Sequence, residues 1–554
     1  MSLKPQTIPP VPASTATVAR AAFPKGTAVL RLRDELGTIY QDELFAALYP
    51  ERGQPAAAPW RLALVSVLQF LEDLPDRQAA DAVRGRIDWK YALSLDLTDP
   101  GFDFSVLSEF RDRLVEGGQE TLLLETLLVR LKEAGLVKPG GRQRTDSTHV
   151  LAAIRGLNRL ETIGETLRAA LNSLAEAAPA WLSERIAPDW FERYGRRVEE
   201  YRLPKGEAAR TALAERIGRD GHQILAAVYA PGAPTGLHAL PAVQALRRTW
   251  VHQFYLEDEQ VRWRTAAELP PAGQRHDSPY DVEARYGNKR SATWVGYKVH
   301  LTETCDAGAP HLITHVETTP APVSDIDRTA PLHEALAARG LAPAVHFLDA
   351  GYVDAPLLLA SQAEHGIEMV GPVRPDASWQ GKTRQGYDLG GFTIDWEARW
   401  EARTVTCPQG RTATCWVPKT DPWGNAVIHV RFPSRACTPC PERAQCTQAK
   451  ASPRNLTFRP RAEHEALQEA RRQQETEEWR QRYATRAGIE GTLAQALQLF
   501  DLRHCRYIGP AKTRLQHVLT AVALNIVRLE AWWTGRPLAK TRISRFAALQ
   551  LSTA

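Results

Sequence analysis

The sequence predicts an α/β protein in which a helical N-terminal region precedes a mixed sheet and a cysteine-containing segment interrupts the chain before its last helices. Three observations favour this fold class. Apolar residues recur at helical spacing from residue 30 to 118, strand-like alternation with intervening helical patterns runs from about 284 to 373, and Gly, Pro, Trp and Cys residues crowd 376–459. The chain has 554 residues, more than one hydrophobic core usually supports, so two or three domains are expected.

The composition is that of an ordinary globular protein, with 44% hydrophobic residues, 24% charged residues and a net charge of +5. The N-terminus lacks the charged start and apolar core of a signal peptide, and apolar runs such as 518–527 are too short to cross a bilayer. Seven cysteines, five of them between Cys407 and Cys446, do not resemble a secreted disulfide framework. We therefore expect a cytoplasmic protein with no membrane partner.

The N-terminal third is expected to be helical. Residues 1–28, rich in Pro, Ala and Thr, are predicted to be a disordered lead, and 29–135 to form a helical domain. A strongly apolar helix is expected over 60–71, and Pro75 interrupts the pattern. Ser105 is placed to cap a further helix, whose apolar positions fall at i, i+3 and i+7: Leu107, Phe110 and Leu114.

A sheet is predicted in the middle of the chain. A Gly turn leads into a short polar strand with Asp146 in its middle, and residues 151–270 then form a helical insertion. Segments 297–302 and 311–316 alternate apolar and polar residues like two neighbouring strands. A helix over 325–339, a buried strand ending at Asp349, a helix over 356–365 and a strand from Glu368 then follow, which indicates a mixed sheet. Helical periodicity returns at Glu463 and runs through Glu490 and beyond, and a last apolar helix from about Lys512 to Trp533 is expected to pack against the sheet.

Two acidic residues on strands and a third on a late helix are the candidate catalytic groups: Asp146, Asp349 and Glu490. In a helix Tyr483 and Glu490 point almost the same way, with Arg486 about 60° to one side. A carboxylate beside an arginine suits a site where a metal ion meets a phosphate. The alternatives are a solvated helix face with an Arg486–Glu490 ion pair, and strand-end aspartates that serve only as turn residues.

Positive charge is concentrated late in the chain. Between residues 483 and 545 there are ten Lys or Arg and three Asp or Glu, a balance that suits a phosphate backbone. Three carboxylates in this setting could bind two Mg²⁺ ions about 4 Å apart, which activate an attacking oxygen and stabilise a leaving one. The pattern therefore indicates in-line phosphoryl transfer on a nucleic acid.

From about residue 36 to 533 the sequence resembles the bacterial insertion-sequence transposases that have an Asp-Asp-Glu catalytic domain of ribonuclease-H-like fold. The resemblance depends on seven segments in order: FDFSVLSEFRDRL at 102–114, TDST at 145–148, GYKVH at 296–300, LDAGY at 348–352, YATRAGIE at 483–490, RYIGPAK at 506–512 and AVALN at 521–525.

The resemblance implies an N-terminal DNA-binding domain and a catalytic domain formed by 136–375 and 460–535, with a Cys/Trp-rich insertion at 376–459 and a basic tail at 536–554. It implies Asp146, Asp349 and Glu490 as ligands of two Mg²⁺ or Mn²⁺ ions, with Tyr483 and Arg486 holding transposon-end DNA. Further candidate DNA contacts are Lys298, Arg506 and Lys512. The related signature has a lysine seven residues after the glutamate, and here that residue is Leu497.

The implied partner is double-stranded DNA, both the transposon ends and the target. A homodimer on DNA is expected because two ends must be paired, and the cytoplasmic protein would then be nucleoid-associated. Two alternatives remain open. One is a transposase-derived DNA-binding protein that does not cut, which Leu497 leaves possible. The other is a structure-selective nuclease of the same fold.

The cysteine-containing segment offers a second metal site. Cys437 and Cys440 have the C-x-x-C spacing that lets two thiolates bind one Zn²⁺, and Cys446 with Cys407 could complete a tetrahedron. Free thiols in a small β insertion and redox chemistry are the alternatives. The tryptophans of this segment form either a small core or a platform for stacking bases: Trp379, Trp396, Trp400, Trp416 and Trp423.

Overall fold

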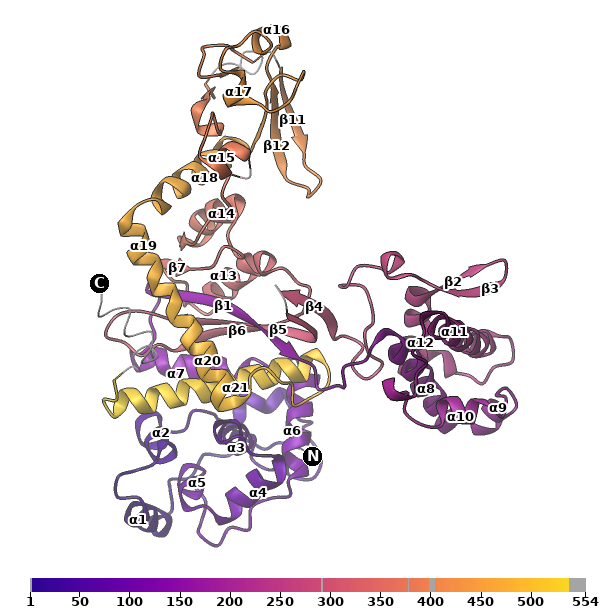
Figure 1. Cartoon of the computed structure of the whole chain (residues 1–554). Helices are drawn as coiled ribbons and strands as arrows, with labels where there is room; N and C mark the ends of the chain where they lie inside the picture. Colours follow the sequence, from indigo (N-terminus) through magenta and orange to yellow (C-terminus); the bar gives the residue numbers. More distant parts are fainter. Residues whose placement is uncertain (1, 290–291, 377, 398–403, 414, 538–554) are drawn as a thin grey trace, which may run out of the picture. The chain divides into compact units, whose positions relative to one another are not determined.

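The computed structural model (Figure 1) describes residues 2–289, 292–376, 378–397, 404–413 and 415–537. The chain forms two compact units. The first unit comprises residues 1–137, 147–323 and 491–554, and the second unit comprises residues 138–146 and 324–490. The predicted basic tail, 536–554, lies from residue 538 onward outside the described residues.

The N-terminal part of the first unit is helical, as predicted. The apolar helix α3 begins at Pro59, whose missing N–H costs nothing at a first helical position, and all of its residues from Pro59 to Phe70 except Arg61 are buried. The helices of this part are α1 (Ala13–Ala22), α2 (Ala28–Leu36), η1 (Asp42–Leu48), α3 (Pro59–Leu71), α4 (Asp76–Gly85), α5 (Ile87–Ala92), α6 (Ser105–Glu116) and α7 (Leu122–Glu133).

The prediction that residues 1–28 are disordered is wrong for Ala13–Ala22, which form helix α1. Ala19 is fully buried and belongs to a small cluster with Leu30 and Tyr91. The Thr15 hydroxyl donates to the Leu95 carbonyl at 2.8 Å. The Ala-rich composition suits a helix, and one buried stripe is enough to fix it against α2 and α5.

Helix α6 begins where predicted, but Ser105 is not its cap. The residue is the first of the helix, and the Asp103 carboxylate accepts its N–H at 2.9 Å. Aspartate two residues upstream satisfies the free amide equally well. The predicted apolar stripe is confirmed, since Leu107, Phe110 and Leu114 are buried.

The predicted helical insertion contains its own core, formed by α8, α11 and α12 around Trp250. Asn158 begins α8 with a capping box to Glu161. A short hairpin, β2–β3, was not foreseen. The elements are α8 (Arg159–Ala177), α9 (Pro179–Ser183), α10 (Trp190–Tyr194), η2 (Glu200–Arg202), α11 (Glu207–Tyr229), η3 (Leu237–Ala239), α12 (Pro241–Gln253), β2 (Phe254–Glu257), β3 (Gln260–Trp263) and η4 (Ala266–Glu268).

In the first unit, β4 (Arg285–Lys289), β5 (Ala292–Thr304) and β6 (Ile313–Pro320) are antiparallel, with β5 in the centre. Strand β5 also neighbours the second half of β1 (Arg142–Leu151). His300 is fully buried and its Nε2 lies 3.2 Å from the Thr319 hydroxyl, so it is a core residue.

The last helix, α21 (Pro510–Trp533), packs against this sheet as predicted. Its buried Asn525 accepts the Ile313 N–H at 2.6 Å and donates to the Ile313 carbonyl at 2.9 Å. Asn525 therefore satisfies one backbone residue of β6 completely, which is a packing role. None of the helices in the described part of the chain combines the length and apolar character that a membrane crossing requires.

In the second unit the first half of β1 pairs in parallel with β7 (Val345–Phe347), and β7 with β8 (Glu368–Val370). The sheet combines antiparallel pairs, β4–β5 and β5–β6, with parallel pairs, β1–β7 and β7–β8, so it is mixed, as predicted. Helices connect these strands in the expected order: η5 (Asp325–Arg328), α13 (Thr329–Ala338) and α14 (Ala355–His365).

The Cys/Trp-rich segment is a small β module within the second unit. Trp396 packs edge-on against Trp416 and Phe458, each at 5.7 Å between ring centroids, so these rings form a core. Trp423 is 83% exposed, and Trp400 lies outside the described residues. The elements are α15 (Trp379–Thr383), η6 (Leu389–Gly391), β9 (Thr393–Asp395), β10 (Thr404–Thr406), β11 (Cys415–Thr420), β12 (Ala426–Arg431), α16 (Ser434–Cys437), α17 (Arg443–Cys446) and β13 (Asn455–Phe458).

The predicted continuous helix through Glu490 is instead four consecutive elements: α18 (Arg461–Gln474), α19 (Glu477–Ala484), the single 3₁₀ turn η8 (Thr485–Ala487) and α20 (Gly488–Phe500). Thr476 separates the first two, because its hydroxyl accepts the Trp479 N–H and caps a new helix. The signature residues Tyr483, Arg486 and Glu490 therefore lie on three successive elements, α19, η8 and α20.

Candidate catalytic site

Three carboxylates of the second unit converge on the guanidinium of Arg486. Its Nη2 lies 2.7 Å from Asp146 Oδ2 and 3.8 Å from Asp349 Oδ2, and its Nη1 lies 3.0 Å from Glu490 Oε1. The predicted acids therefore lie together with the predicted arginine. The Arg486–Glu490 ion pair, considered from the sequence as an alternative, is one contact of this larger group.

Each carboxylate occupies a different kind of local structure. Asp146 lies in β1 and is buried, whereas Asp349 follows β7 and its Oδ1 accepts the Gly351 N–H at 2.8 Å. Glu490 lies in the first turn of α20, where the helix dipole favours negative charge, and its side chain is 65% exposed. The group thus has a buried side at Asp146 and a solvent-accessible side at Glu490.

The electrostatics of Arg486 and Tyr483 reflect these acids. Burial lowers the pKa of Arg486, but Asp146, Tyr483, Asp349 and Glu490 together raise it above its ordinary value. Burial raises the pKa of Tyr483, whose ring stacks on Trp479 at 4.7 Å between centroids. At neutral pH the site therefore carries a charged guanidinium beside a neutral phenol.

The donor set fits a hard divalent cation, because three carboxylates already share one positive charge. Within the described residues no three His, Cys, Asp or Glu side chains lie close enough together to hold a metal ion directly. Arg486 lies among these carboxylate oxygens, so a bound cation and this guanidinium would compete for the same ligands.

Arg144 supports the group from β1 and was not recognised from the sequence. It is buried and donates from Nη1 to the Thr485 carbonyl at 2.7 Å, which holds the turn that carries Arg486. A Cβ on Gly488, the first residue of α20, would clash with that guanidinium, so a larger residue there would force Arg144 to move. In the sequence, Arg144 is marked only by its position two residues before Asp146, which places both side chains on the same face of the strand.

Asp325 is a fourth acid near the group and was also missed. A Cβ built on Gly351 would lie 2.9 Å from Asp349 Oδ1 and 3.6 Å from Asp325 Oδ2, so both carboxylates flank this glycine. Asp325 opens η5 directly after the loop from β6. The sequence signal, an acid after a predicted strand, is the same one that pointed to Asp349.

A buried polar chain links β1 to the helices behind it. The Thr145 hydroxyl lies 2.8 Å from His346 Nε2, His346 Nδ1 lies 2.8 Å from His333 Nε2, and His333 Nδ1 lies 2.9 Å from the Ser361 hydroxyl. All four residues are buried. The chain fixes β1 and β7, and therefore the strand positions from which Asp146 and Asp349 project.

This chain predicts a pH dependence of stability. Burial lowers the pKa of His333 to about 4, whereas an unfolded histidine titrates near 6.5. Between these values the unfolded chain binds more protons, so stability is lost as the pH falls from about 6.5 to 4, by about 3 kcal/mol for this group. His276 and His517 shift in the same direction. The contribution of His333 is measured from denaturation midpoints at pH 7 and pH 4.5. The midpoint should fall more with pH in wild type than in His333→Asn, and an equal fall in both proteins would contradict the prediction.

The other candidate DNA contacts lie in the first unit and form contacts within it. Lys298 Nζ donates to the Val323 carbonyl at 2.6 Å, and Lys512 Nζ lies 2.7 Å from Asp112. Arg506 pairs with Asp73 and its guanidinium lies 4.5 Å from the Phe70 ring centroid. Leu497 is half-buried on α20. Arg506 and Lys512 therefore connect the start of α21 to the N-terminal helices.

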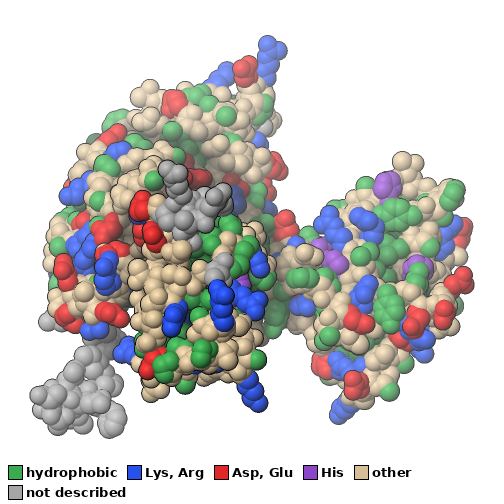
Figure 2. Space-filling model, turned by 90° about the horizontal axis from the view of Figure 1, so that it is seen from above, with side chains coloured by type: hydrophobic (Ala, Val, Ile, Leu, Met, Phe, Trp, Pro, Cys, Tyr) green, Lys and Arg blue, Asp and Glu red, His purple; other side chains and the backbone are tan. Residues whose placement is uncertain are grey.

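The sequence predicts a concentration of basic residues, and the surface in Figure 2 shows how charged side chains are distributed on one face. On the face drawn in Figure 2, Lys and Arg side chains are interspersed with Asp and Glu over the described residues. Around Arg486 the guanidinium is largely enclosed by carboxylates, with 14% of its side chain exposed. Sequence counts alone therefore do not locate a DNA-binding face.

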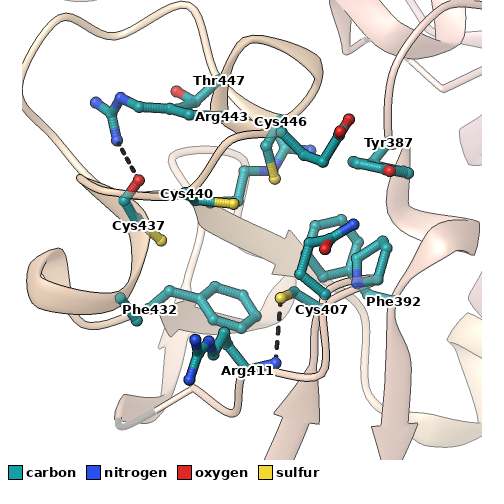
Figure 3. Close-up of a pocket in the computed structure, with 15 residues that line it drawn as sticks. Tyr387, Phe392, Cys407, Arg411, Phe432, Cys437, Cys440, Arg443, Cys446 and Thr447 are labelled. Atoms are coloured by element: carbon teal, nitrogen blue, oxygen red, sulfur yellow. Dashed lines mark hydrogen bonds between the residues drawn. The ribbon is translucent and has the colours of Figure 1, made fainter.

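The four cysteines predicted to form a metal site line one pocket of the β module (Figure 3): Cys407, Cys437, Cys440 and Cys446. Cys415 is on β11, paired with Arg431, and does not line it. This pocket and the carboxylate group have no residue in common.

A mixed α/β sheet with acids on adjacent parallel strands and on a late helix defines the class of ribonuclease-H-like DDE enzymes. Residues 406–530 match the family model described as a transposase DDE domain, and residues 18–113 match a transposase domain called DUF772. The first match includes Tyr483, Arg486 and Glu490. No curated protein matches the chain.

The two matched regions support an insertion-sequence DDE transposase. The fold class and the family resemblance predicted from the sequence are thereby confirmed. The protein is accordingly a transposition enzyme of a class that acts on DNA and generally uses divalent metal ions.

Proposed function

We propose that the protein cuts DNA at the ends of its insertion sequence and joins the exposed 3′ ends to target DNA, with Asp146, Asp349 and Glu490 as the metal ligands. The observation that supports this most directly is the convergence of the three carboxylates on one cation, Arg486. Structural ion pairs rarely gather three acids around a single partly enclosed guanidinium without a use for the combined charge.

Both proposed steps are in-line displacements at phosphorus. In the first, the oxygen of a water molecule bonds to the phosphorus and the 3′ oxygen leaves as a hydroxyl, which gives a 3′-OH and a 5′-phosphate. In the second, this 3′-OH bonds to a target phosphorus and the target's own 3′ oxygen leaves. Divalent ions bound by the carboxylates would stabilise the negative charge on the attacking and leaving oxygens.

The chain's own residues supply orientation around this chemistry. Arg486 is charged, next to the acids and on a turn held by Arg144, so it is placed to bind a DNA phosphate beside the reacting one. Tyr483 keeps its proton and can donate a hydrogen bond to a neighbouring phosphate oxygen. The exposed side at Glu490 is where DNA would approach.

The test places the DNA that flanks this gene on a plasmid and incubates it with purified protein and Mg²⁺. Wild type is compared with Glu490→Gln, and with Glu364→Gln, an exposed carboxylate on α14, as the matched control. We expect cuts at the flanks and joined products from wild type and Glu364→Gln, and neither from Glu490→Gln.

Other outcomes would redirect the assignment. Specific binding of the flanks without cleavage by any variant would indicate a DNA-binding protein that does not cut. Cleavage of branched DNA irrespective of end sequence, with no joined product, would indicate a structure-selective nuclease. Equal cleavage by wild type and Glu490→Gln would remove Glu490 from the catalytic group.

A further inference from the structure

Four of the five clustered cysteines reach the same small space in the β module, although they come from separate parts of its sequence. In Figure 3 the sulfur atoms of Cys407, Cys437, Cys440 and Cys446 point into this pocket from two sides. The cavity has a volume of about 30 Å³, enough for one ion or one water molecule. Aromatic rings of Phe392, Phe432 and Tyr387 close its apolar side.

Cys407 stands at the start of a tight turn that follows β10. Its N–H donates to the Arg411 carbonyl at 2.8 Å, and the Gly410 N–H donates back to its carbonyl at 2.9 Å. The Arg411 N–H points at the sulfur itself, at 3.4 Å from Sγ. This backbone contact holds the Cys407 sulfur in place at the edge of the cavity.

The other three cysteines lie on a second turn, formed by α16, α17 and the residues between them. Cys437 ends α16, Cys446 ends α17, and the Cys440 N–H donates to the Cys437 carbonyl at 3.3 Å. Arg443 fixes this turn by donating to the carbonyls of Cys437 at 3.4 Å and Ala449 at 2.8 Å. Two turns thus present sulfur to each other across the cavity (Figure 3).

The module has little else to hold these turns. Among the described residues of the module, seven are buried in its core: Phe392, Val405, Ile428, Val430, Phe432, Leu456 and Phe458. Trp396 and Trp416 pack against them and are partly buried. Helices α16 and α17 have four residues each, far below the length at which a helix is stable in isolation. Small folds with so limited a core usually need a disulfide or a structural metal.

We propose that Cys407, Cys437, Cys440 and Cys446 bind one structural Zn²⁺. Four thiolates form the commonest closed tetrahedral zinc site, with no position left for water, so the ion has a structural role. Within the described residues the sulfur atoms are not yet at ligation distance, so binding requires the two turns to close on the ion. The inference concerns only this module and does not depend on the proposed strand chemistry.

The first experiment measures zinc in full-length protein purified with a thiol reductant and without chelator. Elemental analysis compares wild type, the double variant Cys437→Ser/Cys440→Ser, and Cys415→Ser as the matched control, because Cys415 does not line the pocket. We expect about one zinc per chain in wild type and in Cys415→Ser, and less than about 0.2 in the double variant.

The second experiment keeps the inference testable if the double variant misfolds, because it uses wild type alone. The purified protein is stripped with a strong chelator and titrated with Co²⁺, which should produce the intense visible absorption of tetrahedral cobalt–thiolate and lose it when Zn²⁺ is added. Absence of this spectrum, or zinc content unchanged in the double variant, overturns the proposal. A disulfide between Cys437 and Cys440 in protein purified with a reductant, found by mass spectrometry, also overturns it.

Discussion

Replacing Asp349 by asparagine is expected to reduce strand cleavage at least about 10³-fold while DNA-end binding and folding are retained. The structure explains why the fold should survive. Asn keeps the side-chain oxygen that accepts the Gly351 N–H, and the ion pair that is lost, at 3.8 Å from Arg486, is the longest of the three. What disappears is one negative charge of the group that would bind the divalent ion. Cleavage is measured on the flanking-DNA plasmid, and binding by a mobility shift of the same ends.

The matched control is Glu368→Gln. Glu368 is an acid of the same unit that pairs with Arg482 on the surface, with 47% of its side chain exposed, and an exposed pair of this kind contributes little. We expect cleavage by this variant to stay within about threefold of wild type, since surface substitutions away from a site are usually small in effect. Cleavage by Asp349→Asn at the wild-type rate would show that Asp349 is not a metal ligand.

The sequence pointed to the acids of the site because each has a local signal. Asp349 ends a hydrophobic strand before a Gly turn, and Glu490 stands at a fixed spacing from Tyr483 and Arg486. The signals of Arg144 and Asp325 are weaker: one stands two residues before Asp146, and the other is an acid that follows a predicted strand. Their roles are recognised only from contacts in the folded chain: Arg144 on β1 contacts the turn η8, and Asp325 lies beside Gly351. These contacts join residues that are far apart in the sequence. Periodicity and spacing cannot supply contacts of this kind.

The same limit applies to the fold. Strands β5 and β6 and the helix α21 were predicted because alternation and apolar spacing extend over many residues. The break at Thr476 and the 3₁₀ turn at Thr485–Ala487 were missed, since each depends on one or two residues inside an otherwise helical pattern. Helix α1 was missed because the Pro- and Ala-rich composition of this segment does not reveal that Ala19 is buried.

Helix α20, which carries Glu490 in its first turn, is anchored in the first unit by a buried ionic network. Glu303 of β5 is fully buried and pairs with Arg528 of α21. The Thr492 hydroxyl on α20 donates to Glu303 at 2.6 Å and accepts from Arg528 at 2.6 Å. Strand β5 and two consecutive helices near the end of the chain, α20 and α21, therefore meet at one buried charge pair, which makes each partner costly to remove.

Arg528→Met is accordingly expected to destabilise the first unit by about 3–5 kcal/mol, because it removes the cation that faces a buried carboxylate. The double variant Glu303→Gln/Arg528→Met should be more stable than Arg528→Met alone, since the unbalanced charge is gone. The measurements are the midpoint of urea denaturation and hydrogen exchange in β5 and α20. Arg536→Met is the control: its side chain is 63% exposed beside Glu530, so its effect should stay below about 1 kcal/mol. Equal stability of Arg528→Met and Arg536→Met would show that the network does not stabilise α20. The position of Glu490 would then have to depend on the contacts of η8 with β1 alone.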